Sequence, residues 1–262
     1  MALGNFYESD MYEKVDLDMA ADYYKIAAEM NEPHALYKVG QLSEKGIYQY
    51  KNERDTRENV LKYYEAAMEQ GSVDATIRLA QIYEKGELGV KVNKDQALSL
   101  YQTADNDEEA MNSIGSILYE KGQYKRAAEF FRKSVVKGNP TGLNNLGTCY
   151  ELGRGVPVNV NKAYEFYEEA SKKGNAQAMS NLGYLLFKKG KVSSTQQQFK
   201  EAAHWFRSSI SHDYTIKDSH YYMGVMHQNG DGVEQCYKSA YKYYKAASDF
   251  EHELACERLG DL

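Results

Sequence analysis

The stretch NPTGLNNLGTCYELGRGVPVNVNKAYEFYEEASKKG, residues 139–174, contains the pattern that decides the fold. Its first half places the small residue Gly147 between Leu146 and Tyr150, which are four residues apart and so lie on one face of a helix. A glycine-rich loop then leads to a second segment with the aromatic pair Phe166-Tyr167. The stretch therefore predicts two helices joined by a loop.

The small residue of this pattern recurs along the whole chain, at spacings of 32 to 41 residues. Self-similarity at this period is typical of stacked helix-turn-helix repeats. The landmark positions are Gly4, Gly40, Ala80, Gly115, Gly147, Gly183, Gly224 and Gly260. They predict an all-α superhelix of about seven repeats, forming one solenoid domain over residues 1–262 with a partial repeat at Gly260.

The second helix of each repeat has a bulky residue bracketed by small ones. In the repeat at Gly147, Tyr167 has Ala163 four positions before it and Ala170 three positions after it. A large ring packs well only where the facing ridge is cut down to Ala or Ser. We therefore expect these aromatic residues to form the core between helices, in preference to a ligand-stacking stripe.

The landmark, the glycine loop Gly153-Arg154-Gly155-Val156 and the bracketed aromatic pair resemble the Sel-1-like repeats, relatives of the tetratricopeptide repeats with longer loops. The resemblance covers essentially the whole chain and implies a right-handed superhelix. The repeat at Gly115 departs from it, because its short loop Gly122-Gln123-Tyr124-Lys125 looks like that of a plain tetratricopeptide repeat. We expect the glycine loops to be helix caps and turns, since no phosphate-binding signature accompanies them.

Two polar inserts, at 47–59 and 191–198, are predicted as long loops on one edge of the solenoid, either functional or merely tolerated. The chain opens and closes within a first helix, at Leu3-Gly4 and at Leu259-Gly260. Solenoids usually end in atypical polar repeats. We therefore expect a segment of a longer repeat protein, with a shortened natural cap as the competing interpretation.

Composition narrows the function classes. A net charge of −6 disfavours nucleic acid as the main partner, and no apolar run reaches membrane-spanning length. Three irregularly placed cysteines fit a reducing compartment, which favours the cytoplasm, with a translocated effector or a secretory lumen as alternatives if a signal lies outside this segment. The histidines lack a tight metal-ligand spacing, and no catalytic motif appears, so we predict no metal, no cofactor and no enzyme.

Binding is the function that the pattern favours. If the first helices line a concave face, the residues three before and one after each landmark point into a groove with a polar, uncharged centre and aromatic shoulders. Asparagines can satisfy both the N–H and the C=O of a peptide. The predicted partner-binding residues on this face are Tyr37, Asn112, Ser116, Asn144, Thr148, Tyr184 and Tyr221.

We therefore expect a monomeric protein-protein interaction scaffold or adaptor that binds a protein or peptide of unknown identity. A preformed surface of this kind lowers the ordering cost of binding. One alternative is a regulatory or substrate-docking arm of a larger enzyme or complex. An alternative from a different class is a hydrolase built from repeats.

Overall fold

The computed structural model describes residues 1–9, 16–47, 52–193 and 195–260, and within these ranges the chain consists of helices joined by turns, with no strand. The helices fall into two compact units, Met1–Ile117 and Leu118–Leu262. We refer to them as the N-terminal and the C-terminal unit and treat each by itself. The predicted all-α class is confirmed, whereas a single solenoid over 1–262 stays a prediction.

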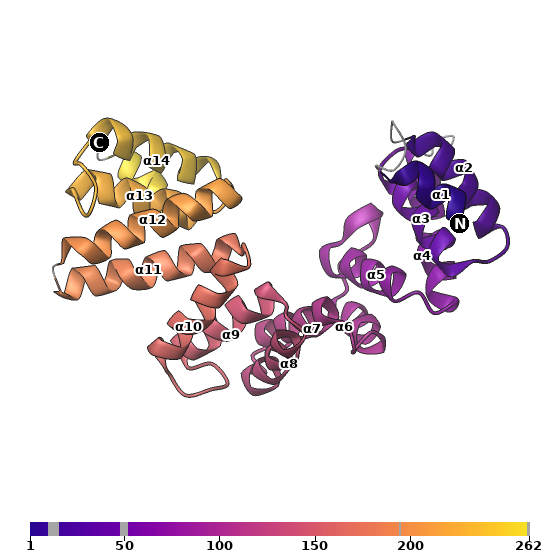
Figure 1. Cartoon of the computed structure of the whole chain (residues 1–262), viewed down its shortest axis with the longest axis horizontal. Helices are drawn as coiled ribbons and strands as arrows, with labels where there is room; N and C mark the ends of the chain where they lie inside the picture. Colours follow the sequence, from indigo (N-terminus) through magenta and orange to yellow (C-terminus); the bar gives the residue numbers. More distant parts are fainter. Residues whose placement is uncertain (10–15, 48–51, 194, 261–262) are drawn as a thin grey trace. The chain divides into compact units, whose positions relative to one another are not determined.

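Each predicted repeat contributes a first and a second helix, and consecutive helices between Ala2 and Thr103 and between Tyr124 and Gly260 pack against each other (Figure 1). The first helices are α1 (Ala2–Glu8), α3 (Pro33–Glu44), α5 (Val73–Lys85), α7 (Glu108–Glu120), α9 (Pro140–Leu152), α11 (Ala176–Ser193), α13 (Lys217–Asn229) and α15 (Glu253–Gly260). The second helices are α2 (Leu17–Ala28), α4 (Glu53–Glu69), α6 (Lys94–Thr103), α8 (Tyr124–Val136), α10 (Val160–Lys172), α12 (Gln196–His212) and α14 (Tyr237–Asp249).

Gly4, Gly40, Gly147, Gly183 and Gly224 lie where a first helix touches the bulky residue of its own second helix. A Cβ added to Gly40 would lie 2.8 Å from the Tyr64 ring, and one added to Gly147 would lie 2.7 Å from the Tyr167 ring. Real Cβ atoms do not approach this closely, so the small residue is required. Both tyrosines are fully buried, as the bracket of small residues predicts.

The glycine loops end the first helices and contact the preceding second helix. Gly86, Gly153 and Gly230 adopt left-handed C-cap conformations, which confirms their expected capping role. Further along two of these loops, Gly155 lies against the backbone of Tyr124 and Gly232 against that of Phe199, with no room for a side chain. A short 3₁₀ helix, η1 (Glu87–Gly89), occupies the loop after α5.

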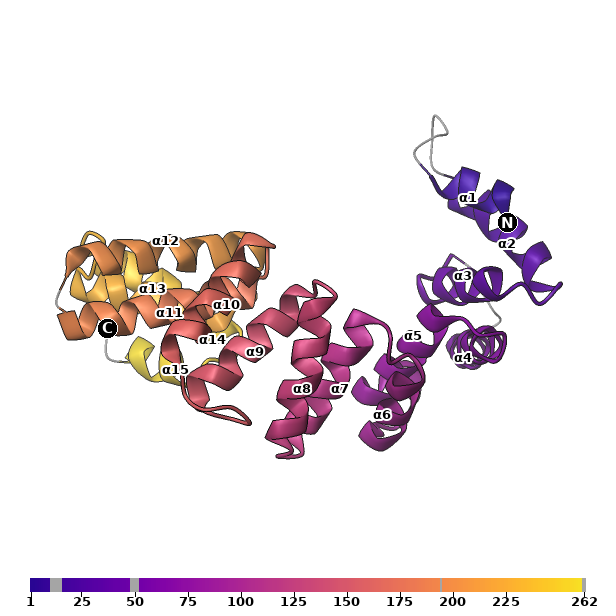
Figure 2. The ribbon, with the colours of Figure 1, turned by 60° about the horizontal axis from the view of Figure 1, so that its bottom comes forward.

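The prediction of long loops for the two inserts is wrong over most of their length. Residues 53–59 form the start of α4, while 48–51 lie outside the described residues. Residues 191–193 continue α11 and 196–198 begin α12, so these two helices run 18 and 17 residues and lie side by side (Figures 1 and 2). Lys, Gln, Glu and Arg are strong helix formers, and this propensity favours helix over loop in polar inserts.

Candidate functional site

A buried tyrosine of each of several second helices donates a hydrogen bond to the side chain four residues after the landmark. Tyr64 Oη donates to Glu44 Oε2 at 2.8 Å, and Tyr167 Oη donates to Glu151 Oε2 at 2.9 Å. The same contact joins Tyr24 to Glu8, Tyr101 to Glu84 and Tyr244 to Gln228. Burial, together with Glu44, raises the pKa of Tyr64 above its ordinary value, so the hydroxyl keeps its proton and donates.

The sequence signal for this contact is that the residue four after the landmark changes together with the buried ring from one repeat to another. Where the buried ring is phenylalanine, as at Phe131 and Phe206, the residue four after the landmark is Tyr119 or Phe187 and not an acid or amide. A carboxylate beside a phenylalanine ring would have no hydroxyl group to donate a hydrogen bond to it. This third position lies on the same helical face as the two positions predicted around each landmark, but it was not among the predicted binding residues.

In the N-terminal unit the next first helix adds a cation to this contact. Lys38 Nζ lies 2.9 Å from Glu8 Oε1, and Arg78 pairs with Glu44 and also lies 2.5 Å from Glu87. Burial alone would raise the pKa of the Glu8 and Glu44 carboxyls, but the hydrogen bonds from tyrosine and from Lys38 or Arg78 lower both below the ordinary value. This edge of the unit is bridged by long charged side chains.

In the C-terminal unit the corresponding side chains are short or aromatic. Asn181 Nδ2 donates to Asn144 Oδ1 at 2.9 Å, Thr148 Oγ1 lies 3.1 Å from Tyr167 Oη, and the ring centroids of Tyr184 and Tyr222 are 5.0 Å apart. Thr148, Tyr167, Asn181, Tyr184 and Tyr222, from α9, α10, α11 and α13, line a hollow of about 310 Å³. Glu151, Ser180 and Asp218 complete its polar lining.

Of the predicted binding residues, Thr148 and Tyr184 come together at this hollow. Asn144 and Tyr221 do not face an open groove as expected, because they are only 6 % and 9 % exposed. The position three before a landmark is covered by the following repeat: Asn181 lies against Asn144, and the His252 ring stacks on that of Tyr221 at 4.3 Å.

The remaining predicted residues belong to the N-terminal unit. The half-buried ring of Tyr37 lies 5.7 Å from that of Tyr64, and Ser116 Oγ donates to the backbone oxygen of Asn112 at 3.1 Å. The expected uncharged centre is wrong for this unit, since the pairs formed by Glu8 and Glu44 lie on the first helices themselves. Their positions, four after one landmark and two before the next, were not part of the predicted set.

The described residues form no metal site and no membrane-spanning helix, and the buried cysteine is not activated. Among the described residues, no three His, Cys, Asp or Glu side chains gather in a way that could hold a metal ion. Cys149, Cys236 and Cys256 are free thiols, and burial raises the pKa of the Cys149 thiol to about 11, so it is not an activated nucleophile. No helix within the described ranges combines the length and the apolar character needed to cross a membrane.

Comparison with solved structures finds the same architecture elsewhere. A protective antigen of uropathogenic Escherichia coli, c5321, which displays the Sel-1-like repeat fold, matches with a TM-score of 0.80 and 25% sequence identity over 99% of this chain and 55% of its own. The chain thus spans about half the length of that protein. A Sel1 repeat protein from Oxalobacter formigenes matches with a TM-score of 0.75 and 20% identity, over 95% of this chain and 98% of its own.

These likenesses confirm the predicted superhelical repeat class. Comparison with curated proteins finds no match. The Sel1 repeat model matches residues 1–32, 33–72, 73–104, 140–175, 176–214 and 217–249, and a tetratricopeptide repeat model matches 109–137, which confirms the departure seen at Gly115. The chain belongs to the Sel1 repeat family.

Proposed function

We propose that this chain is a protein-interaction scaffold, and that the first-helix face of its C-terminal unit binds a peptide or protein segment. Stacked helical repeats generally serve as binding surfaces, which supports the coarse class. Thr148, Asn181 and Tyr184 form the centre of the proposed site. Tyr37, Asn112 and Ser116 stay predictions for a second contact region in the N-terminal unit.

The observation that carries the proposal is the hollow between α9, α11 and α13. Its walls offer a hydroxyl at Thr148, an amide at Asn181 and an aromatic ring at Tyr184. Hydroxyl and amide groups can bond to both N–H and C=O of a peptide backbone, while an aromatic ring contributes apolar contact at little entropic cost. Asn181 takes over the role predicted for Asn144, because Asn181 is partly exposed and lines the hollow, whereas Asn144 is buried.

The groups around the hollow are held in place before any partner arrives. The Thr148 hydroxyl lies within hydrogen-bond distance of the buried Tyr167, and Tyr167 in turn donates to Glu151. Tyr184 is held between the Tyr222 ring and the Lys188 ammonium, which lies 4.9 Å from the Tyr184 ring centroid. A preformed surface loses less conformational entropy on binding, so modest contacts suffice for a specific complex.

Affinity capture from a cell lysate, read by mass spectrometry, tests this proposal. The test variant is Tyr184→Ala, and the matched control is Tyr241→Ala, which removes an exposed tyrosine from the second helix α14. We expect a partner that is captured by the wild type and by the control but lost from the test variant. Equal capture by all three proteins would exclude this face as the binding site.

A further inference from the structure

The extension of α11 over residues 191–193 has a fixed position. Gly190 lies so close to Phe199 that an added Cβ would approach the ring to 2.9 Å, and the rings of Phe187 and Phe199 contact edge to face. Lys191 Nζ forms an ion pair with Asp231 Oδ2 at 2.7 Å, on the loop of the next repeat. Contacts to Phe199 and to Asp231 therefore hold the last turn of α11, so its outward-facing side chains have defined positions.

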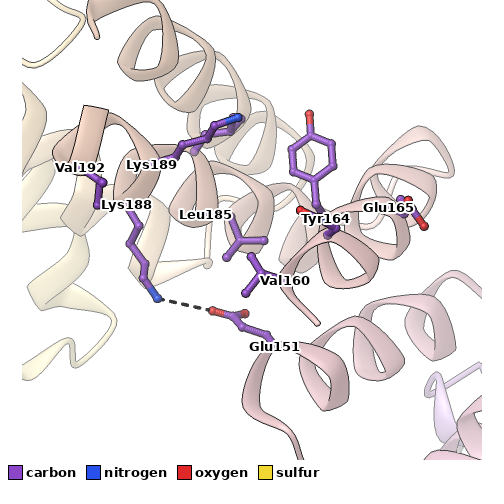
Figure 3. A pocket seen from close by; sticks show the side chains of 10 residues that line it. Glu151, Val160, Tyr164, Glu165, Leu185, Lys188, Lys189 and Val192 are labelled. Carbon is purple, nitrogen blue, oxygen red and sulfur yellow. Dashed lines mark ion pairs between the residues drawn. The ribbon is translucent and has the colours of Figure 1, made fainter. Parts of the chain in front are cut away.

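This extension borders a second and larger hollow, of about 730 Å³. Leu185 forms part of its floor at 8 % exposure, while Val160 at the start of α10 and Val192 at the end of α11 are 50 % and 89 % exposed (Figure 3). Apolar side chains gathered around a concave surface gain free energy when another apolar group covers them. The hollow is thus suited to an apolar side chain of a partner.

The charges around this hollow are not all matched. Lys188 reaches toward Glu151, with 4.0 Å between Nζ and Oε1, and Glu151 also accepts from Tyr167. Lys189 points away from Glu151 (Figure 3), and its ammonium forms no ion pair with any residue in the described ranges. Glu165 also lines the hollow, but it lies on the far side of Tyr164 from Lys189 (Figure 3). A partner that places a carboxylate beside its apolar side chain, at the Lys189 end of the hollow, would supply the counter-charge that Lys189 lacks.

The two hollows share a wall. Glu151 lines both, and Lys188 contacts the Tyr184 ring on one side while it lines the larger hollow on the other. A segment lying across the first-helix face can therefore continue over Glu151 into the larger hollow. We propose that this hollow binds an aliphatic or aromatic side chain of the partner segment, with a neighbouring aspartate or glutamate of that segment paired to Lys189. This inference rests on the proposed function and names the chemistry of the partner.

Selection from a random dodecapeptide library displayed on phage tests this inference without knowledge of the natural partner. The wild type should enrich peptides in which Leu, Ile, Val or Phe stands within two positions of Asp or Glu. Lys189→Glu should change the enriched charge from acidic to basic, whereas the control Lys242→Glu, at an exposed lysine of α14, should leave it acidic. An unchanged preference in Lys189→Glu, or no enrichment at all, overturns the inference.

Fluorescence anisotropy with the best selected peptide then tests the apolar part. Val192→Asp should weaken binding about tenfold, because it places a charge at an apolar contact. The control Val136→Asp changes a valine that is 86 % exposed at the end of α8 and should have no effect. Both valines are exposed, so neither change threatens folding.

The same peptide separates this inference from the proposed function. Loss of binding in Tyr184→Ala with unchanged binding in Val192→Asp would support the first-helix face and overturn the assignment of the larger hollow. Binding unaffected by either change would overturn both. Peptides that bind only through a free terminal carboxylate, and lose binding when it is amidated, would overturn the side-chain assignment at Lys189.

Discussion

The N-terminal and C-terminal units are built from the same kind of helix pair, but different side chains bridge one first helix to the next. In the N-terminal unit, Arg78 reaches back to Glu44 and Lys38 reaches back to Glu8. In the C-terminal unit the residue at the position of Arg78 is Asn181, which bonds to the neighbouring amide of Asn144. The long bridging side chains of the N-terminal unit are replaced by short ones in the C-terminal unit, and the hollow lies beside these short side chains.

The contacts that both units share stabilise the fold, whereas the contact that differs between them is a candidate for binding. The glycine–aromatic contact is present in both units, so it belongs to the fold. The tyrosine–carboxylate contact is also present in both, at Glu44 and at Glu151. The residue two before the landmark of the following repeat changes from a cation, Lys38 or Arg78, to the amide of Asn181, and this position is therefore the one we associate with binding.

The largest effect is expected where the two units are alike. Gly40→Leu and Gly147→Leu should each destabilise their own unit by about 3 kcal/mol, since the new side chain would overlap the buried tyrosine ring. Hydrogen exchange followed by mass spectrometry measures this loss for each unit separately. Gly260→Leu is the control, because no atom of the part of the chain that the structure describes lies within 4 Å of its Cβ position. Equal protection in all three variants would mean that the glycine contact is not tight.

A smaller effect should distinguish the units. Arg78→Met should cost the N-terminal unit about 1 to 2 kcal/mol, because it leaves the partly buried Glu44 carboxylate without its cation. Asn181→Ala should cost the C-terminal unit about 0.5 to 1 kcal/mol, the value of one neutral hydrogen bond. Urea denaturation measures both. A larger loss for Asn181→Ala would show that the amide pair, and not the ion pair, is the stronger contact.

Acid should affect the N-terminal unit through Glu8 and Glu44. Their pKa values are lowered in the folded state, so below the ordinary value of 4.5 the unfolded chain takes up protons first and the stabilisation shrinks as the pH falls. Between pH 5 and 3 the wild type should therefore lose stability through both groups. Thermal unfolding of Glu44→Gln should show a weaker dependence on pH over this range. An identical dependence would contradict the assignment.

The smallest effect concerns His220 in the C-terminal unit. Burial lowers the pKa of this histidine below 6.5, partly offset by its bond to the backbone oxygen of Tyr214. As the pH falls below 6.5 the unfolded chain is protonated first, so stability should decrease already near pH 6, by less than about 1 kcal/mol. His220→Phe should remove this slope, whereas the control His204→Phe, at an exposed histidine, should keep it. A slope that persists in His220→Phe would point to another group.

The repeat pattern predicted the fold closely because each landmark reports a contact made within one helix pair. Gly147 and Tyr167 are near each other in sequence, and the size of one limits the other. The site was predicted less well, since it depends on how consecutive repeats cover each other. Tyr221 and Asn144 have a polar or amphipathic character that suggests exposure, but the following repeat buries them. Thr148 and Tyr184, one position after their landmarks, stay partly exposed.

Photo-cross-linking from one position in each unit tests the central claim most directly. Benzoylphenylalanine placed at Tyr184 in the C-terminal unit and at Tyr37 in the N-terminal unit replaces a half-buried aromatic residue in both cases. We predict that the partner is cross-linked from position 184 and much less from position 37, because the open polar edge lies beside Tyr184. Stronger cross-linking from position 37 would contradict the account and place the binding surface on the charge-bridged edge.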